Sequence, residues 1–341
     1  MKKIGVVGAG YWSQTHLRAW SQVEGATVQC LCDTDEAVLK ERGAQFQIDH
    51  QHLYTELEEL LQYEDIDAVD IVTKPDTHRE IVEIVAKTGR DILCQKPFAQ
   101  TVQEAQDILK TVERHRVRLM VTENWRWLEP FRQVKLHIQS QIIGNIQQIR
   151  FLDCKYATPT FAPDRAIPQP YFRTMPNLLF FEMGIHWLDV WRYLFGEPVS
   201  LYAAATRISP YVQGEDTGVV TLKHEGFFGH MDVSWASRRS MANQRDECPI
   251  EQMIVEGDRA TLILYQDNRL VLRQTDGTER VLSNGYKFNM EESFSRLQRH
   301  FLSCLQDGTE FQTSGADNLK TLSLVFAVYE SLRTNQVVDL N

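Results

Sequence analysis

A glutamate, a histidine and an aspartate lie close together in an otherwise apolar stretch, EMGIHWLD at residues 182–189. In a helix, Glu182, His186 and Asp189 fall along one stripe, which Tyr193 extends. Because burying polar groups without partners costs free energy, this stripe should face a ligand, a metal, a neighbouring polar network or the polar edge of an interface. A buried imidazole steered by a carboxylate one turn away can exchange a proton near neutral pH.

A glycine-containing loop, GAGYWS at residues 8–13, forms a second candidate site. Gly8 permits a tight turn, Gly10 lets the backbone approach a pyrophosphate, and the helix that follows offers N–H donors at its N-terminus. Ser13 stands where a third glycine or alanine is usual, and it is small enough for close packing of the helix. The loop therefore predicts a dinucleotide site.

An acidic residue, Asp33, follows the next apolar run, 20 residues beyond Ser13. A carboxylate there accepts hydrogen bonds from the ribose hydroxyls of NAD and repels the 2′-phosphate of NADP. We therefore expect NAD to be preferred over NADP. The alternative is that Asp33 is only a loop or helix-cap residue before Asp35 and Glu36.

A metal site is an alternative for the stripe in residues 182–189, because carboxylate and imidazole groups on one helix face can share an ion. No companion cluster of histidine, cysteine or aspartate suggests further ligands, so no metal is expected. The six cysteines include no C-x-x-C pair and mostly occupy apolar segments, which predicts reduced packing residues.

Strand and helix patterns alternate in the first part of the chain, around the glycine loop. Short apolar runs typical of a buried parallel sheet occur at residues 3–10, 27–32, 68–73, 91–94 and 117–122. The helical patterns between them carry T-x-x-E capping boxes at Thr55, Thr77 and Thr101, and Gly89 stands where the second helix should end. This alternation predicts an α/β fold with a doubly wound sheet.

The pattern changes after Asn124 to strands separated by short turns. Strands are predicted at residues 146–156, 200–208, 217–224, 228–235, 251–257, 260–265 and 269–274. Such connections favour an antiparallel meander. Helical patterns follow at residues 291–307 and 316–333.

Composition narrows the class of function. The net charge of −10 argues against a surface for nucleic acid or anionic membranes, so small-molecule chemistry is expected. No apolar run is long enough to span a bilayer, and the chain enters a strand pattern without a signal-peptide core. We therefore expect a cytoplasmic protein.

Four motifs, taken with the glycine loop and Asp33, make the pattern specific. They are TKPDTH (73–78), QKP (95–97), ENWRW (123–127) and EMGIHWLD (182–189). In order and spacing the set resembles the Gfo/Idh/MocA family of sugar and polyol oxidoreductases over nearly the whole chain. The resemblance implies an N-terminal Rossmann dinucleotide-binding domain at residues 1–123. It also implies a C-terminal α+β domain with a mostly antiparallel open sheet, for substrate binding and oligomerisation, at residues 124–341.

The same resemblance implies roles for individual side chains. Lys96 orients and polarises a substrate hydroxyl, His186 exchanges its proton, and Glu182 orients His186. The residues expected to bind the cofactor are Gly8, Gly10, Tyr11, Trp12, Asp33, Thr73, Pro75, His78, Gln95, Lys96 and Asn124. Those expected to contact substrate are Lys96, Trp125, Arg126, Tyr171, Arg173 and His186.

Three departures from the family pattern bear on the geometry around the substrate. Gln95 replaces the glutamate of the Glu-Lys-Pro motif, and Glu182 replaces an aspartate with a longer side chain. The sequence NLLFF at residues 177–181 stands where a glycine run is common. A glutamate can still orient His186 and a glutamine can still form hydrogen bonds, but neither change is neutral.

A proline-rich stretch at residues 158–176 precedes the histidine motif and predicts a long ordered loop, since prolines disfavour helices and central strands. We expect it to form one wall of a substrate cleft, with Tyr171 against a sugar ring and Arg173 near hydroxyls or a carboxylate. Packing of the loop against a partner subunit is the alternative.

The sequence as a whole predicts an NAD-dependent oxidoreductase that acts on a secondary hydroxyl of a cyclic polyol, sugar or sugar derivative. Two alternatives are a net non-redox lyase or glycosidase reaction with retained NAD, and a non-catalytic nucleotide-sensing regulator on the same fold. A homodimer or homotetramer through the C-terminal sheet is expected, because one sheet face is left available.

Overall fold

A computed structural model describes residues 1–238, 250–285 and 289–340. Contacts within the chain divide it into two compact units. The first comprises Met1–Trp127 and Asn289–Leu322, and the second comprises Leu128–Phe288 and Ser323–Asn341. The first unit therefore ends near the expected boundary at residue 123 but also includes residues 289–322, which the sequence placed with the second domain.

The first unit is built on a parallel sheet whose strand order is β3-β2-β1-β4-β5-β6. Its strands are β1 (Lys2–Val7), β2 (Ala26–Cys32), β3 (Leu53–Tyr54), β4 (Ala68–Ile71), β5 (Asp91–Cys94) and β6 (Leu119–Val121). All five predicted strands are confirmed, and the two-residue β3 was not predicted. The order reverses direction between β1 and β4, which makes this the Rossmann arrangement of a doubly wound sheet.

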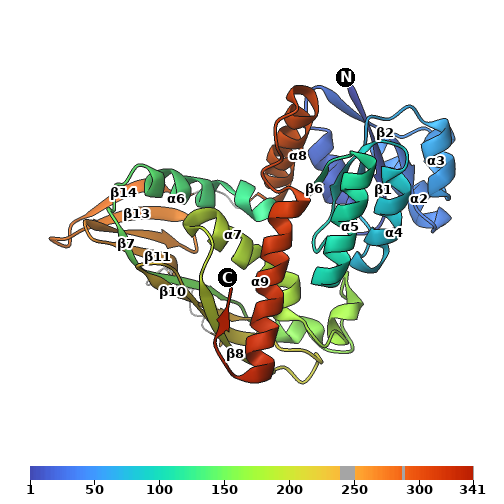
Figure 1. The fold of residues 1–341 in the computed structure, drawn as a ribbon. Helices are drawn as coiled ribbons and strands as arrows, with labels where there is room; N and C mark the ends of the chain where they lie inside the picture. The colour runs from blue at the N-terminus through green and yellow to red at the C-terminus, as the bar shows by residue number, and fades with distance from the viewer. Residues whose placement is uncertain (239–249, 286–288, 341) are drawn as a thin grey trace. The chain divides into compact units, whose positions relative to one another are not determined.

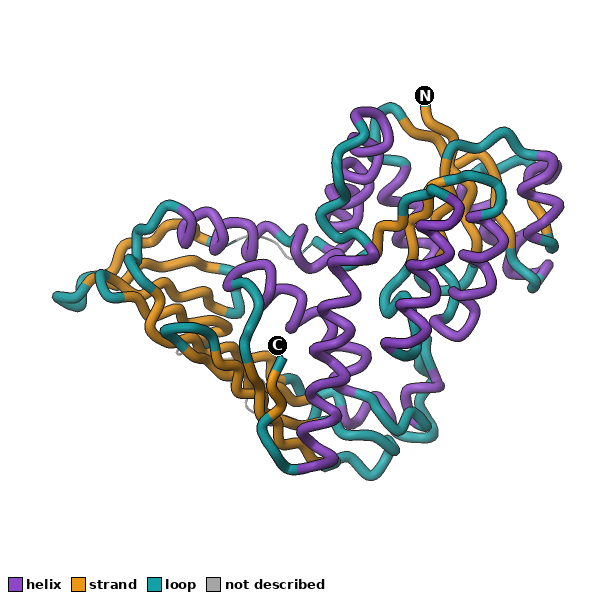
Figure 2. Tube along the Cα trace, viewed as in Figure 1, coloured by secondary structure: helices purple, strands orange, loops and turns teal. Residues whose placement is uncertain are grey.

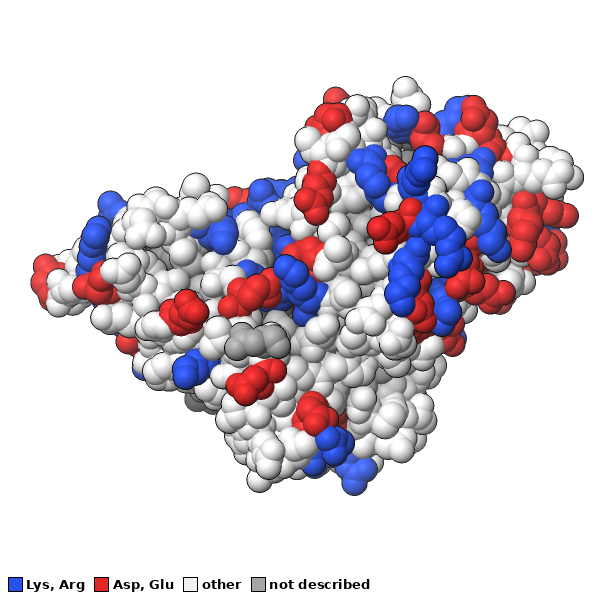
Figure 3. Space-filling model, viewed as in Figure 1, with Lys and Arg blue, Asp and Glu red and all other residues white. Residues whose placement is uncertain are grey.

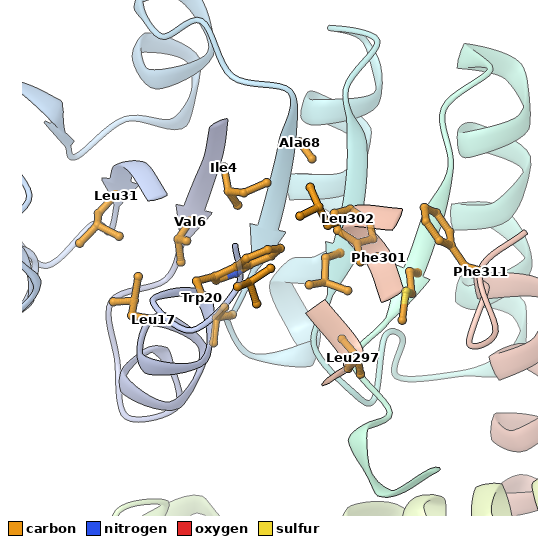
Figure 4. Close-up of a cluster of buried hydrophobic side chains, with 14 of the residues drawn as sticks. Ile4, Val6, Leu17, Trp20, Leu31, Ala68, Leu297, Phe301, Leu302 and Phe311 are labelled. Carbon is orange, nitrogen blue, oxygen red and sulfur yellow. The ribbon is translucent and has the colours of Figure 1, made fainter. Parts of the chain in front are cut away.

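Helices cover both faces of this sheet (Figure 1). They are α1 (Ser13–Trp20), α2 (Glu36–Phe46), α3 (Leu57–Tyr63), α4 (Pro75–Ala86), α5 (Val102–His115) and α8 (Met290–Asp307). Trp20 of α1 and Phe301 of α8 meet Ile4 and Val6 of β1 in one buried apolar cluster (Figure 4). Burial of this cluster explains why α8 belongs to the first unit although it lies far along the sequence.

Only one of the three predicted capping boxes forms at a helix start. Thr101 caps α5 and accepts a hydrogen bond from the backbone N–H of Glu104 at 3.1 Å. Thr77 lies inside α4, which begins at Pro75, and Glu56 precedes α3 at the cap position in place of Thr55. Those two predictions were wrong: α4 begins with a proline, which suits the first helical position, and α3 begins one residue later than predicted, without a side-chain cap.

The second unit is built on a nine-stranded sheet of order β14-β13-β12-β11-β7-β10-β9-β8-β15. Its strands are β7 (Ile146–Cys154), β8 (Ser200–Thr206), β9 (Thr217–Lys223), β10 (Phe228–Ser234), β11 (Glu251–Gly257), β12 (Ala260–Tyr265), β13 (Arg269–Gln274), β14 (Glu279–Asn284) and β15 (Val338–Asp339). The seven predicted strands are confirmed, and β14 and β15 are additional. Pairing is antiparallel except between β7 and β10, so the sheet is not a simple meander.

Helices α6 (Glu129–Gln139) and α7 (Ile185–Phe195) lie on one face of this sheet (Figure 2). Helix α9 (Gly315–Thr334) begins in the first unit, and its residues from Ser323 onward belong to the second. On the other sheet face, Val219 and Phe228 are 43% and 49% exposed. This face therefore presents large apolar side chains to solvent.

The proline-rich stretch at residues 158–176 contains two 3₁₀ turns, Thr158–Phe161 and Pro170–Arg173, without an α-helix or strand. The prediction of a long ordered loop is therefore confirmed. The five described cysteines are free and buried, as predicted, whereas Cys248 lies outside the described residues.

Charged side chains of both signs are interleaved on the visible face of the first unit (Figure 3). Arg79 pairs with Glu83 and Asp107, and Lys110 also pairs with Asp107, which links α4 to α5. Within the described part of the chain, no helix has the length and hydropathy needed to cross a membrane.

Candidate functional site

The predicted cofactor residues lie at the carboxyl edge of the parallel sheet. The glycine loop follows β1, Asp33 follows β2, Thr73 lies two residues past β4, Lys96 lies two residues past β5, and Asn124 lies three residues past β6. Strands β1 and β4 are neighbours, but the chain continues from β1 towards β2 and from β4 towards β5, on opposite sides. The loops that carry these residues therefore surround the point at which the strand order reverses. Ligands of doubly wound folds bind at this position.

The glycine loop leaves room for a ligand above its backbone. Gly8 has φ +101°, and a Cβ added there would lie 2.6 Å from the carbonyl oxygen of Val72. At Gly10, by contrast, an added Cβ would have no described atom within 4 Å. Ser13 begins α1 and its hydroxyl donates to the Gly10 carbonyl at 2.7 Å. The turn is therefore fixed by Gly8 and Ser13, while Gly10 faces open space.

Asp33 is joined directly to this loop. One carboxylate oxygen accepts from the backbone N–H of Ala9 at 2.6 Å, and the other accepts from Asp35 N–H at 2.9 Å. Arg42 of α2 donates from Nε to the Ala9 carbonyl at 3.1 Å. Asp33 is partly exposed, so its carboxylate can still reach a ligand. These groups fit an adenine dinucleotide, because the cradle at Gly10 and the carboxylate at Asp33 match a pyrophosphate and a ribose.

The TKPDTH motif forms the end of β4 and the start of α4. Pro75 is the first residue of α4 and Thr73 is half-buried. His78 is fully buried, and its Nε2 lies 3.2 Å from the Thr73 carbonyl oxygen. Burial lowers the pKa of His78 to about 4, so the ring is neutral at pH 7. The structure thus places His78 beneath Thr73, where it supports the loop.

Gln95 and Lys96 form the turn after β5. The Gln95 side-chain oxygen accepts from the backbone N–H of Lys96 and from the Thr122 hydroxyl, both at 2.8 Å. The Gln95 amide nitrogen lies 3.0 Å from Nε2 of His16 in α1. Gln95 is therefore buried in a network behind the turn, while Lys96 is partly exposed.

The far side of this network is a carboxylate on β4. Nδ1 of His16 lies 2.9 Å from Asp70, and the indole N–H of Trp20 donates to the same carboxylate at 2.8 Å. Gln298 of α8 donates to the His16 carbonyl at 3.1 Å. The sequence prediction did not include His16 or Asp70, although His16 lies three residues past the glycine loop and Asp70 is a charged residue inside an apolar strand.

Glu123 is another functional candidate that sequence reasoning missed. It is fully buried two residues past β6, beside the Thr122 that contacts Gln95. Burial raises the pKa of the Glu123 carboxyl to about 7, although the charges of Lys96 and Arg126 act to lower it. The group can therefore gain or lose a proton near neutral pH within the electrostatic reach of Lys96.

The remaining residues of ENWRW are buried and tied to the C-terminal part of the first unit. Asn124 donates to the Ser293 hydroxyl of α8 at 2.7 Å. Arg126 donates to the Gln312 carbonyl at 3.1 Å and pairs with Asp317 at 2.6 Å. These contacts show how Asn124 and Arg126 hold the segment together; their predicted ligand contacts, and that of the buried Trp125, stay predictions.

The polar stripe that motivates the catalytic assignment lies in the second unit. His186 is in the first turn of α7 and is 6% exposed, as is Glu182, while Asp189 is fully buried. The helix is preceded by a π-helical turn at Phe180–Gly184. Glu182 thus lies in the π turn, so its angular relation to His186 differs from that of two residues in one regular α-helix.

Two tryptophans of α7 fix the helix to its surroundings. The indole N–H of Trp187 donates to Asp153 of β7 at 2.8 Å, and that of Trp191 donates to His224 at 2.9 Å. Both tryptophans are almost completely buried. Helix α7 can therefore neither rotate nor slide without breaking hydrogen bonds in the core, which gives His186 a fixed place in this unit.

The start of the π turn is held by a distant carboxylate. Glu215 accepts from the backbone N–H groups of Leu178 at 3.2 Å and Phe180 at 3.1 Å. The Tyr329 hydroxyl of α9 donates to Glu215 at 2.7 Å and accepts from Phe181 N–H at 3.0 Å. Glu215 and Tyr329 thus satisfy N–H groups that a helix start leaves without intrahelical partners.

The side chain of Arg173 forms its hydrogen bonds within the proline-rich loop. Arg173 donates to the backbone carbonyls of Phe161, Ala162 and Arg165 at 2.6–2.8 Å. Tyr171 contacts the Phe172 ring at a centroid distance of 5.1 Å. Arg173 therefore closes the loop on itself, and the predicted substrate contacts of Tyr171 and Arg173 stay predictions.

Within the described ranges, no group of three or more His, Cys, Asp or Glu residues is arranged to hold a metal ion. The site residues instead comprise a dinucleotide cradle with a lysine in one unit and a histidine with a carboxylate in the other. A Rossmann unit followed by a unit with an open, mostly antiparallel sheet defines a class of two-domain nucleotide-dependent oxidoreductases.

Comparison with known proteins gives the family. Residues 2–123 match the oxidoreductase family with an NAD-binding Rossmann fold, and residues 131–263 match the GFO/IDH/MocA C-terminal domain. The chain therefore belongs to the Gfo/Idh/MocA oxidoreductase family, as the sequence motifs predicted.

Three similar proteins span nearly the whole chain. D-apiose dehydrogenase of Paraburkholderia graminis is 36% identical, covering 99% of this chain and 89% of its own. D-apiose dehydrogenase of Rhizobium rhizogenes is 33% identical, covering 99% of this chain and 97% of its own. An oxidoreductase from Agrobacterium radiobacter, solved in complex with NAD⁺, L-tartaric acid and magnesium, has a TM-score of 0.88 and 32% identity, covering 99% and 98%.

Proposed function

We propose that this protein is an NAD-dependent dehydrogenase that oxidises a hydroxyl of a sugar or polyol, and that D-apiose is the first substrate to test. The observation that carries the proposal is 36% identity to a D-apiose dehydrogenase over 99% of the chain. The dinucleotide cradle at Gly10 and the polar pair of Glu182 and His186 agree with this chemistry.

Oxidation of an alcohol removes a hydroxyl proton as well as two electrons. Bound NAD would supply the electron acceptor, held by the Gly8–Gly10 turn and Asp33. In the proposed mechanism His186 takes the hydroxyl proton, Glu182 orients its ring, and the Lys96 ammonium polarises the substrate oxygen. Burial of His186 limits competing proton exchange with water.

The assignment of Lys96 and His186 is tested by substitution with alanine. Loss of a positioned proton acceptor costs roughly 10²- to 10⁴-fold in rate, so each variant should lose most of kcat on a substrate that wild type oxidises. NAD⁺ affinity, measured by calorimetry, should stay close to wild type in His186→Ala. Full turnover in either variant would contradict the assignment.

We further propose that NAD is preferred over NADP, because Asp33 would repel a 2′-phosphate. Titration of tryptophan fluorescence with each nucleotide tests this, with Trp12 in the loop as a nearby reporter. NAD⁺ should bind at least about tenfold more tightly than NADP⁺, a difference of about 1.4 kcal/mol in binding free energy. In Asp33→Ser, the affinities for the two nucleotides should differ by less. Equal affinities in the wild-type protein would refute the preference.

Self-association through the open sheet face is also proposed, as a homodimer or homotetramer. Val219 and Phe228 support it, because both are exposed on the same face of adjacent strands and could be covered by a second copy of the chain.

A further inference from the structure

The network behind Lys96 has a hydrogen-bonding pattern that can be worked out atom by atom. A backbone N–H can only donate, so the Gln95 atom that faces the Lys96 N–H at 2.8 Å must be the amide oxygen. The Gln95 amide nitrogen then faces His16 Nε2, 3.0 Å away. The orientation of the amide is therefore dictated by the chain and leaves no equivalent flipped form.

This orientation determines the proton on His16. An amide nitrogen can only donate, so Nε2 of His16 must accept and carries no proton. Nδ1 lies 2.9 Å from the side-chain oxygen of Asp70 that also accepts from the Trp20 indole N–H. Nδ1 must therefore carry the proton, and the ring is neutral. The Phe294 ring packs against the imidazole, with 4.7 Å between the two ring centroids, and adds no polar partner.

A carboxylate in place of the Gln95 amide would change the number of protons on the His16 ring. Its oxygens could still accept from Lys96 N–H and from Thr122. The oxygen facing His16 and Nε2 would then have to share one additional proton. Imidazole is ordinarily more basic than a carboxylate, so this proton would lie on Nε2 and the ring would become an imidazolium between two carboxylates. Residue 95 therefore sets the charge of His16.

The network is rigid because its side chains are shielded from water. His16, Asp70 and Thr122 are fully buried, and Gln95 is nearly so. No solvent molecule can readily replace a lost partner, so a mismatch at one atom must be relieved by movement. The hydrogen bond from the Lys96 backbone N–H to Gln95 joins this network to the turn.

We propose that Gln95 is a positioning residue that keeps His16 neutral, with its proton on Nδ1, and so fixes the backbone of Lys96 against α1 and β4. The consequence for catalysis rests on the proposed function, because Lys96 acts on substrate only in that account. The protonation of His16 does not depend on it.

The first test is histidine ¹⁵N NMR on the full chain, with His16 assigned through its backbone. Wild type should show one protonated and one unprotonated ring nitrogen at pH 7, and Gln95→Glu should show both protonated. Gln100→Glu makes the same change at an exposed position and should leave His16 unchanged. An imidazolium in wild type, a proton on Nε2, or an unchanged ring in Gln95→Glu would overturn the proposal. The wild-type spectrum tests the assignment even if Gln95→Glu does not fold.

The second test separates positioning from folding. Gln95→Glu should lower kcat tenfold or more, while its circular dichroism spectrum stays that of the folded wild-type protein. A normal kcat with a protonated His16 would overturn the positioning role. If wild type oxidised no sugar or polyol, the proposed function would fail, and the NMR result would still decide the state of His16.

Discussion

Glu123 illustrates how burial can control chemistry at the scale of one residue. Its carboxyl is fully enclosed, and burial outweighs the attraction of Lys96 and Arg126. The negative charge beside Lys96 therefore depends on pH near neutrality, unlike the charge on an exposed glutamate. Sequence motifs could identify Lys96, but the burial of Glu123 comes from tertiary packing that a motif does not encode.

The raised pKa of Glu123 predicts a pH-dependent stability. Its pKa is about 7 when folded against an ordinary 4.5, so the folded state binds the proton more tightly. This contribution is complete below pH 4.5 and is lost as pH rises through 7, a change of about 3 kcal/mol in the free energy of unfolding. Urea unfolding of wild type and Glu123→Gln across pH 5–8 measures the difference.

The control for this prediction is Glu113→Gln, because Glu113 is exposed on α5. That variant should keep the wild-type pH dependence, whereas Glu123→Gln should lose the component between pH 5 and 7. If Glu123→Gln unfolded with the same pH dependence as wild type, Glu123 would not be the titrating group.

At the scale of elements, the histidine helix depends on partners outside itself. The sequence predicted its polar stripe, and the burial of Glu182, His186 and Asp189 confirms that feature. The π turn and its support were not predictable from local spacing. Glu215 lies more than thirty residues beyond the turn, and Tyr329 more than a hundred beyond Glu215, so only the fold brings them together.

Removing Glu215 should loosen the start of this helix. Glu215→Leu leaves the N–H groups of Leu178 and Phe180 without their acceptor, which costs about 1–3 kcal/mol in the free energy of unfolding. Amide hydrogen exchange should accelerate at residues 178–181 in particular. Glu225→Leu, the same change at an exposed turn residue, is the control. Equal exchange in the two variants would mean that Glu215 does not hold the turn.

At the scale of the whole molecule, regular elements were predictable and their assembly was not. Short apolar runs identified twelve strands. The other three were not predicted, because β3 and β15 have only two residues each and β14 is mostly polar and exposed. The grouping of α8 with the first unit arises from the packing of residues such as Phe301 against β1, which no local pattern specifies.

The open sheet face gives a prediction for the assembled protein. Phe228→Lys puts a charge on the exposed face and should lower the molar mass measured by light scattering at micromolar concentration. Tyr63→Lys, at an exposed position of the first unit, should keep the wild-type mass. A monomeric wild type, or an unchanged mass in Phe228→Lys, would exclude association through this face.

Oxidation of a sugar or polyol by this protein should transfer electrons to NAD⁺ with net formation of NADH. The most direct measurement is the amount of NADH formed per molecule of D-apiose consumed, followed over many turnovers with wild-type protein, and extended to a panel of other sugars and inositols. One NADH should form for each molecule of a panel member consumed. Consumption without accumulation of NADH would show a non-redox reaction with retained cofactor, and consumption of no panel member would contradict the proposed function.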